Sequence, residues 1–171
     1  MMYKKNKDAT FYFDMDNTIL EWCPYGKNEE WVEKGYPLKK GFFENLKMFE
    51  GSDIVIKTLK EIGFDVKILS ACESTPYCKP EKLKWLKKNL PFIKKNDIHL
   101  ILNGETKSSF CKSADHILID DYGKNLKEWH EKGGLAIKKS TSGKKKSHLH
   151  VIRLEEIFNV LESLGYVTKI I

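Results

Sequence analysis

The sequence of 171 residues lacks any apolar run as long as the ~18–20 residues that a membrane-spanning helix needs. Its first residues, MMYKKNKDATFYF, contain neither the apolar stretch nor the small-residue cleavage site of a secretory signal. No segment repeats, and the only biased stretch is KKSTSGKKKSHLH at 138–150, which we expect to be an exposed loop. These absences exclude membrane-spanning, fibrous and fully disordered proteins, and we expect a cytoplasmic protein.

Cysteine is scarce and is not spaced for metal binding. No two of the four cysteines form a C-x-x-C pair. A structural zinc site needs closely paired ligands, and a disulfide framework is typical of secreted domains. We therefore expect reduced thiols at these positions, which are Cys23, Cys72, Cys78 and Cys111.

The chain carries a modest excess of positive charge. Lysine and arginine number 30 against 24 aspartate and glutamate residues, which gives a formal net charge of +6. A positive field favours anionic partners, but lysines dispersed among 32% charged residues serve hydration first, so we do not expect nucleic-acid binding. The hydrophobic fraction of 41% suffices for one core, and the length predicts a single domain over residues 1–171.

Short apolar runs alternate with amphipathic segments along most of the chain. We expect strands at residues 9–13, 64–70, 97–102, 115–121 and 135–138, and helices at 52–62, 80–90, 125–133 and 153–164. Such alternation is typical of a parallel sheet with helices on both faces, an α/β fold.

Residues 20–52 break this alternation. The segment is rich in glycine and proline, yet it also holds seven aromatic residues: Trp22, Tyr25, Trp31, Tyr36, Phe42, Phe43 and Phe49. A solvated loop does not have this composition, so we expect a small helical insertion that packs over another part of the protein or against a second subunit. The sequence therefore leaves a homodimer as one of the two alternatives.

Polar residues follow three of the predicted strands. Asp14 and Asp16, in DMDNT, come directly after the first strand, Ser70 ends the second, and Asp120–Asp121 end a later one. In parallel sheets ligands bind outside the carboxyl ends of the strands. We therefore expect these side chains to meet at one edge of the sheet.

Two carboxylates at this spacing can act on one phosphorus atom. Asp14 can attack it as a nucleophile and form an aspartyl-phosphate. Asp16 can then give a proton to the leaving oxygen and afterwards take one from water. The alternative interpretation is a simple Asx-turn that leaves a strand.

Carboxylates beside a phosphate dianion repel it, so a cation is needed. Mg²⁺ suits ligand sets made only of oxygen. The expected ligands are Asp14 and Asp16 with Asp120 and Asp121 completing the shell, while Ser70 donates to a phosphoryl oxygen. A lysine should balance the remaining negative charge.

In this order the motifs resemble those of the haloacid dehalogenase (HAD) phosphatases, over most of the chain. FYFDMDNT is similar to the first motif of that superfamily, ILSA to the second and ILIDD to the fourth. The resemblance implies a Rossmann-like sheet and a cap inserted after the first strand, here residues 20–52. The third motif is a lysine, for which Lys107 is our first choice, with Lys82 and Lys112 as alternatives.

A closer resemblance is to the 5'(3')-deoxyribonucleotidases, also called C-type pyrimidine 5'-nucleotidases. It rests on DMD, on Trp22, and on the segments GFFENLKMFEGS, PEKLKWLKKNLPF and LIDDYGKNLKEWHEKGGLAIK. It implies Mg²⁺-dependent hydrolysis of nucleoside monophosphates in the cytosol, with a small-molecule nucleotide as the substrate.

The nucleotidase resemblance also implies a place for the substrate. Trp22 and Phe43, with Phe42 as a weaker candidate, would line the nucleoside pocket, and aromatic rings can stack on a base. Ala71 stands where animal relatives have a second hydroxyl residue, so its backbone N–H would contact the phosphate.

Two other functions remain possible. A polynucleotide end-phosphatase, or a phosphatase of another small metabolite, would use the same chemistry on a different substrate. A phospho-receiver module also combines carboxylates, a hydroxyl residue and a lysine, but the order of its motifs differs, and we do not expect it.

Overall fold

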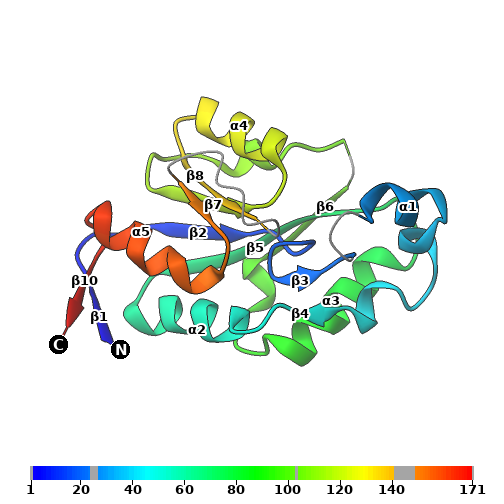
Figure 1. The fold of residues 1–171 in the computed structure, drawn as a ribbon, viewed down its shortest axis with the longest axis horizontal. Coiled ribbons are helices and arrows are strands. Elements are labelled where there is room, and N and C mark those ends of the chain that lie inside the picture. Colours follow the sequence, from blue (N-terminus) through cyan, green and yellow to red (C-terminus); the bar gives the residue numbers. More distant parts are fainter. Residues whose placement is uncertain (1, 24–26, 103, 141–148, 171) are drawn as a thin grey trace.

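A sheet of six parallel strands forms the centre of the computed structural model, which describes residues 2–23, 27–102, 104–140 and 149–170 (Figure 1). The central strand β2 lies between β5 and β7, and the spatial order is β6-β5-β2-β7-β8-β9. The strands span β2 Thr10–Phe13, β5 Asp65–Cys72, β6 Ile98–Leu102, β7 His116–Asp120, β8 Leu135–Lys139 and β9 His150–Val151.

Helices cover both faces of this sheet. On one face α2 (Ser52–Ile62), α3 (Cys78–Asn89) and α5 (Ile157–Ser163) contribute to a core that includes Phe11 and Phe13 of β2. The other face packs Tyr12 of β2 against Trp129 of α4 (Gly123–Glu131), so successive residues of β2 serve opposite faces (Figure 1). The α/β prediction, with a parallel sheet covered on both faces, is confirmed.

Two small antiparallel pairs accompany the sheet, and the sequence analysis predicted neither. β1 (Met2–Lys5) pairs with β10 (Val167–Ile170), which joins the two ends of the described chain. β3 (Leu20–Glu21) pairs with β4 (Lys47–Met48). These strands have two to four residues each, which is too few for an alternation pattern to stand out.

Two sequence predictions in the C-terminal part are wrong in detail. The helix expected at 153–164 begins with a 3₁₀ turn at Leu154–Glu156, where the Glu156 carboxylate accepts the N–H of Ile152. The stretch 138–150 is not all exposed, because Lys139 and Ser140 are buried at the end of β8 and His150 is buried in β9. Its residues 141–148 lie outside the described residues.

The insertion at 20–52 contains one short helix, α1 (Asn28–Glu33), and two 3₁₀ turns. The β3–β4 pair brings its two ends together. Helix α3 holds its far part: Glu81 accepts the backbone N–H groups of Gly41 (2.6 Å) and Phe43 (3.0 Å), and Trp85 Nε1 donates to the carbonyl of Leu46 (2.7 Å). The insertion is therefore anchored by polar bonds as well as by its aromatic rings.

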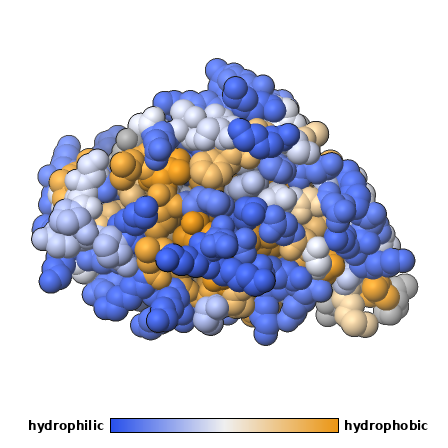
Figure 2. Space-filling view, turned by 180° about the vertical axis from the view of Figure 1, so that it is seen from behind, coloured by the Kyte–Doolittle hydropathy of each residue, from blue (hydrophilic) through white to orange (hydrophobic). Residues whose placement is uncertain are grey.

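The surface is mostly hydrophilic, as the 32% charged residues require. Figure 2 shows charged and polar residues over most of one face, with hydrophobic residues appearing between them in patches. Within the described residues, every helix is too short or too polar to cross a membrane.

The buried carboxylate of Glu81 supplies the first prediction. Glu81→Ala leaves the N–H groups of Gly41 and Phe43 without their acceptor, so we expect a loss of roughly 2–3 kcal/mol in the free energy of unfolding. Urea unfolding measures this loss. The matched variant Glu81→Gln keeps one acceptor oxygen and should lose about half as much. Equal stability of Glu81→Ala and the unchanged chain would contradict the proposed anchor.

Candidate active site

The predicted acidic residues meet at the carboxyl end of the central strands. Asp14 follows β2, and its N–H donates to the carbonyl of Ile119 in β7 (3.0 Å). Because Phe13 is in register with Ile119, Asp14 lies beside Asp120. Each of Asp14, Asp120 and Asp121 offers one carboxylate oxygen, and these oxygens all lie within 4.8 Å of one another. Three acids thus share one small volume.

This crowding changes the proton affinity of the acids. Burial, with repulsion from Asp14, raises the pKa of Asp120 to about 6. Burial, with the nearby Asp14 and Asp120, raises the pKa of Asp121 to about 8. A cluster that holds protons so firmly carries more negative charge than its surroundings neutralise. Oxygen ligands with excess negative charge fit a divalent cation such as Mg²⁺.

Lys107 supplies part of the missing positive charge. Its ammonium nitrogen lies 2.6 Å from Asp14 Oδ1 and 2.7 Å from Asp120 Oδ2. Burial alone would lower the pKa of Lys107, but these two carboxylates outweigh it and raise the pKa. Lys107 therefore stays charged and fixes the two carboxylates relative to each other.

Lys82 forms a second polar cluster. Its ammonium nitrogen donates to Asp16 Oδ2 (2.6 Å), Ser70 Oγ (3.0 Å) and the carbonyl of Ala71 (2.6 Å). The side chain is fully buried and its nitrogen lies 4.9 Å from the centre of the Phe43 ring. The hydroxyl predicted to bind phosphate thus has a lysine beside it.

Asp16 differs from the other acids in its surroundings. Burial raises its pKa, while Lys82 opposes the shift. Its Oδ1 atom is enclosed and has no hydrogen-bond partner among the described residues. The backbone turns sharply behind it, since Asn17 has a left-handed φ of 55°, a conformation that asparagine tolerates better than most residues. This carboxyl is suited to carry a proton.

The structure therefore brings most of the predicted site residues together, in two groups. Asp14, Asp120, Asp121 and Lys107 form the first, and Asp16, Ser70 and Ala71 join Lys82 in the second. The side chain of Asp16 lies outside the group of three carboxylates that could share a metal ion. Lys112, the third candidate lysine, is exposed, and its backbone N–H donates to His116 Nδ1 (3.2 Å).

The sequence analysis did not predict one residue that holds the Asp120 carboxylate. Asn125, in the first turn of α4, donates to Asp120 Oδ2 (2.9 Å), and the N–H of Tyr122 donates to Oδ1 of the same carboxylate (2.8 Å). These bonds use both oxygens of Asp120. The sequence did offer a signal for Asn125, since it is a polar residue in the first turn of the helix that follows the acidic pair.

The predicted nucleoside-binding aromatics have different exposures. Phe43 is only 1% exposed and packs against Cys72 and Cys78, so its ring forms a wall beside Lys82. Trp22 and Phe42 are half-buried, with ring centroids 6.1 Å apart in an edge-to-face contact. In this arrangement Trp22 and Phe42 are better placed than Phe43 to touch a ligand.

Comparison with known proteins identifies the family of the chain. The family model described as "5' nucleotidase, deoxy (Pyrimidine), cytosolic type C protein" matches residues 13–164. The chain belongs to this nucleotidase family. It is a HAD-type phosphatase, and the family predicted from the motifs is confirmed. Among curated proteins, none matches the chain in sequence.

Solved structures of HAD hydrolases share the fold of this nucleotidase at low sequence identity. One from Bacillus subtilis, bound to magnesium, has a TM-score of 0.63 and 14% identity, and the match covers 91% of this chain and 99% of that one. Another, from Deinococcus radiodurans R1 with bound phosphate and sodium, has a TM-score of 0.63 and 9% identity, with 95% and 99% covered. A dehalogenase has a TM-score of 0.65 and 11% identity, with 91% and 98% covered.

The raised pKa of Asp121 predicts how the stability of this nucleotidase depends on pH. The folded carboxyl titrates at about 8 and the ordinary value is 3.8, so the folded state binds the proton more tightly. Stability without metal should therefore rise as the pH falls from 8 to 6, by at most ~1.4 kcal/mol per pH unit for one proton.

Urea unfolding in the presence of a chelator measures this dependence. Asp121→Asn lacks the titrating group, so its stability should change less over the same pH range. Identical slopes for the variant and the unchanged chain would show that Asp121 is already ionised in the folded protein at pH 6.

Proposed function

We propose that this chain hydrolyses nucleoside monophosphates, deoxyribonucleotides in particular, through an acyl phosphate formed on the Asp14 carboxylate. The observation that carries the proposal is the contact of Asp14 with Lys107, which also holds Asp120, together with the nearby cluster of Asp16, Lys82 and Ser70. One group fixes a nucleophile and the other offers an acid and phosphate-binding donors, which together are the parts that phosphoryl transfer needs.

The first step transfers the phosphoryl group to Asp14. Its Oδ atom attacks phosphorus, the bond from phosphorus to the nucleoside oxygen breaks, and Asp16 gives its proton to that oxygen. The raised pKa of Asp16 favours the protonated carboxyl before this step. In the second step Asp16 takes a proton from water, whose oxygen attacks phosphorus and releases phosphate and the free Asp14 carboxylate.

The phosphoryl oxygens need hydrogen-bond donors during both steps. The Ser70 hydroxyl and the Lys82 ammonium lie 3.0 Å apart and can both face one phosphoryl group. The N–H of Ala71 is the third donor that we propose. Lys107 orients Asp14 through the 2.6 Å contact to its Oδ1 atom.

We propose Mg²⁺ as the cofactor, because three carboxylate oxygens lie within 4.8 Å of one another. Asp14, Asp120 and Asp121 would hold the ion, which when bound offsets the negative charge of substrate and carboxylates. The magnesium bound to the Bacillus subtilis hydrolase supports this choice. The cytosolic description of the family supports a cytoplasmic location.

Activity assays with Asp14 and Asp16 variants test the mechanism. Phosphate release from a panel of nucleoside monophosphates should require Mg²⁺, stop with chelator, and vanish in Asp14→Asn. Asp16→Asn should lower kcat by roughly 10²–10⁴-fold, because it removes the acid and base. Circular dichroism spectra of the variants serve as the folding control.

The panel also contains an oligonucleotide with a terminal phosphate and a set of phosphorylated metabolites. Higher kcat/KM on deoxyribonucleoside monophosphates than on any other member is the expected outcome. Preference for oligonucleotide ends, or for another metabolite, would keep the chemistry and overturn the proposed substrate. Full activity of Asp14→Asn would overturn the mechanism itself.

Trp22 is expected to contact the nucleoside and not the phosphate. Trp22→Ala should therefore raise KM for a deoxyribonucleoside monophosphate by roughly tenfold, as expected for the loss of a stacking ring. KM for phenyl phosphate, which has no nucleoside, should change much less. Phe43→Ala serves as a comparison, since removal of the wall beside Lys82 should impair both substrates. Equal effects of Trp22→Ala on the two substrates would contradict a base-binding role.

A further inference from the structure

The outer edge of β8 is only partly covered by another strand. β9 pairs with β8 at Lys138 and Lys139 alone. Along the preceding residues, Leu135–Ile137, β7 pairs with β8 on the inner side, and none of the described strands lies on the outer side. A stretch of sheet edge is therefore available for pairing.

The backbone direction at this edge follows from its neighbours. The N–H of Lys138 donates outward to the carbonyl of Leu149 (2.9 Å), and the N–H of Ser140 donates outward to Val151 (2.8 Å). Alternate residues of a strand point their backbone groups to the same side. The N–H and carbonyl of Ala136 thus also point outward, and among the described residues neither has a backbone partner on that side.

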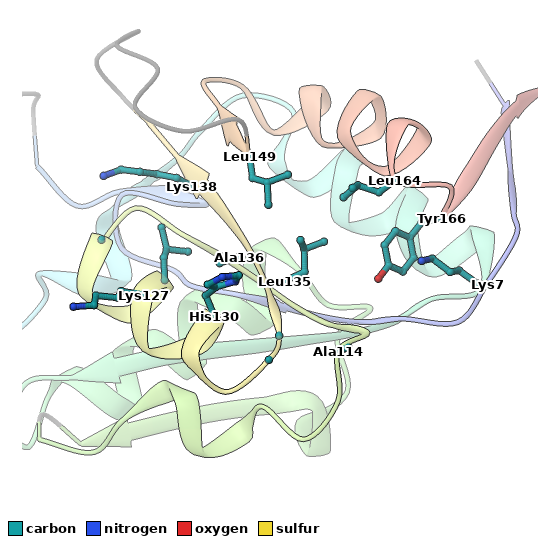
Figure 3. Close-up of a pocket in the computed structure, with 14 residues that line it drawn as sticks. Lys7, Ala114, Lys127, His130, Leu135, Ala136, Lys138, Leu149, Leu164 and Tyr166 are labelled. Atoms are coloured by element: carbon teal, nitrogen blue, oxygen red, sulfur yellow. The ribbon is translucent and has the colours of Figure 1, made fainter.

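A groove of about 650 Å³ runs along this edge (Figure 3). Its walls come from helices on opposite faces of the sheet. Lys127 and His130 of α4 stand on one side, while Leu149, Leu164 and Tyr166 stand on the other, near α5 and β9, with β8 as the floor (Figure 3). One wall is therefore basic at its rim and the other is mainly apolar.

Among the described residues, the groove is lined by lysines and one histidine and by no carboxylate. Besides Lys127 and His130, these basic residues are Lys7 and Lys138. Nearby carboxylates stay outside the lining: Glu131 lies 3.9 Å from the Lys127 nitrogen, and Asp115 accepts the Tyr166 hydroxyl. The groove thus favours an occupant with negative charge, and a second copy of the same basic rim would be repelled.

We propose that this groove binds an extended, acidic peptide segment of a partner protein as an added strand beside Ala136. Side chains of an added strand alternate between the two faces of the sheet. Acidic side chains would face Lys127 and His130, and the alternating apolar ones would pack on Leu149 and Leu164, since Tyr166 is only 4% exposed and Lys7 lies over its ring. The occupant is therefore a segment in which acidic and apolar residues alternate, held by the backbone groups of Ala136.

Fluorescence anisotropy of a labelled probe peptide tests the proposal on the full chain. The probe is a short capped peptide of alternating glutamate and valine, and we expect saturable binding to the unchanged protein. The same peptide with lysine in place of glutamate should not bind. A third peptide, methylated on its backbone nitrogens, should also fail, because strand pairing needs those N–H groups.

Substitutions in and outside the groove test whether the peptide binds there. Lys127→Glu should weaken binding by about tenfold or more. Lys57→Glu is the matched control, since Lys57 also pairs with a glutamate one helical turn away (3.8 Å) but lies on α2, outside the groove. Ala136→Pro removes the outward N–H, a change that edge strands tolerate, and should abolish binding. All three variants should retain phosphatase activity.

Three results would overturn the proposal. They are no saturable binding of the glutamate peptide, equal weakening by Lys127→Glu and Lys57→Glu, and binding that survives both Ala136→Pro and backbone methylation. A dimer in solution that Lys127→Glu dissociates would instead identify a second copy as the occupant. Because activity is measured in parallel, failure of the groove is distinguishable from failure of the proposed hydrolysis.

Discussion

The repulsion among Asp14, Asp120 and Asp121 is the constraint on which the rest of the site depends. The fold places three carboxylates at the ends of two neighbouring strands, where burial makes ionisation costly. Lys107 enters this volume and contacts two of them. Without such a cation the ionised cluster would oppose folding, because unpaired buried charge is among the most destabilising features of a protein interior. The same excess of negative charge is what fits the site for a metal ion.

The second lysine divides the site into two functional halves. Lys82 binds Asp16 and Ser70 and is screened from water by Phe43. Its helix, α3, also carries Glu81, which holds the backbone of Gly41 and Phe43 in the insertion. One helix therefore positions both a phosphate-binding cation and the aromatic wall beside it. Movement of the insertion relative to α3 would disturb the polar cluster and the wall together.

The sheet that positions the active site also forms the groove, at the outer edge of β8. Among the described strands, β9 covers only Lys138 and Lys139 of β8, and Ala136 lies in a groove with a basic rim on one wall and apolar residues on the other. The active site uses the carboxyl ends of the central strands, while the groove uses the side of an outer one. The two can differ in function because they draw on different residues.

Much of the architecture could be read from the sequence. Apolar runs and helical spacing predicted the five main strands and the family motifs predicted Asp14, Asp16, Ser70 and the acidic pair, because strand ends and short motifs are local features. Only the tertiary structure decided which lysines enter the site, since the contact of Lys107 with Asp14 joins residues 93 positions apart. The bond from Asn125 to Asp120 is local, but it was missed because it depends on how α4 begins after β7. The tertiary structure also decided that Phe43 is buried while Trp22 is half-buried, because exposure depends on what packs above a ring, and no local pattern encodes that.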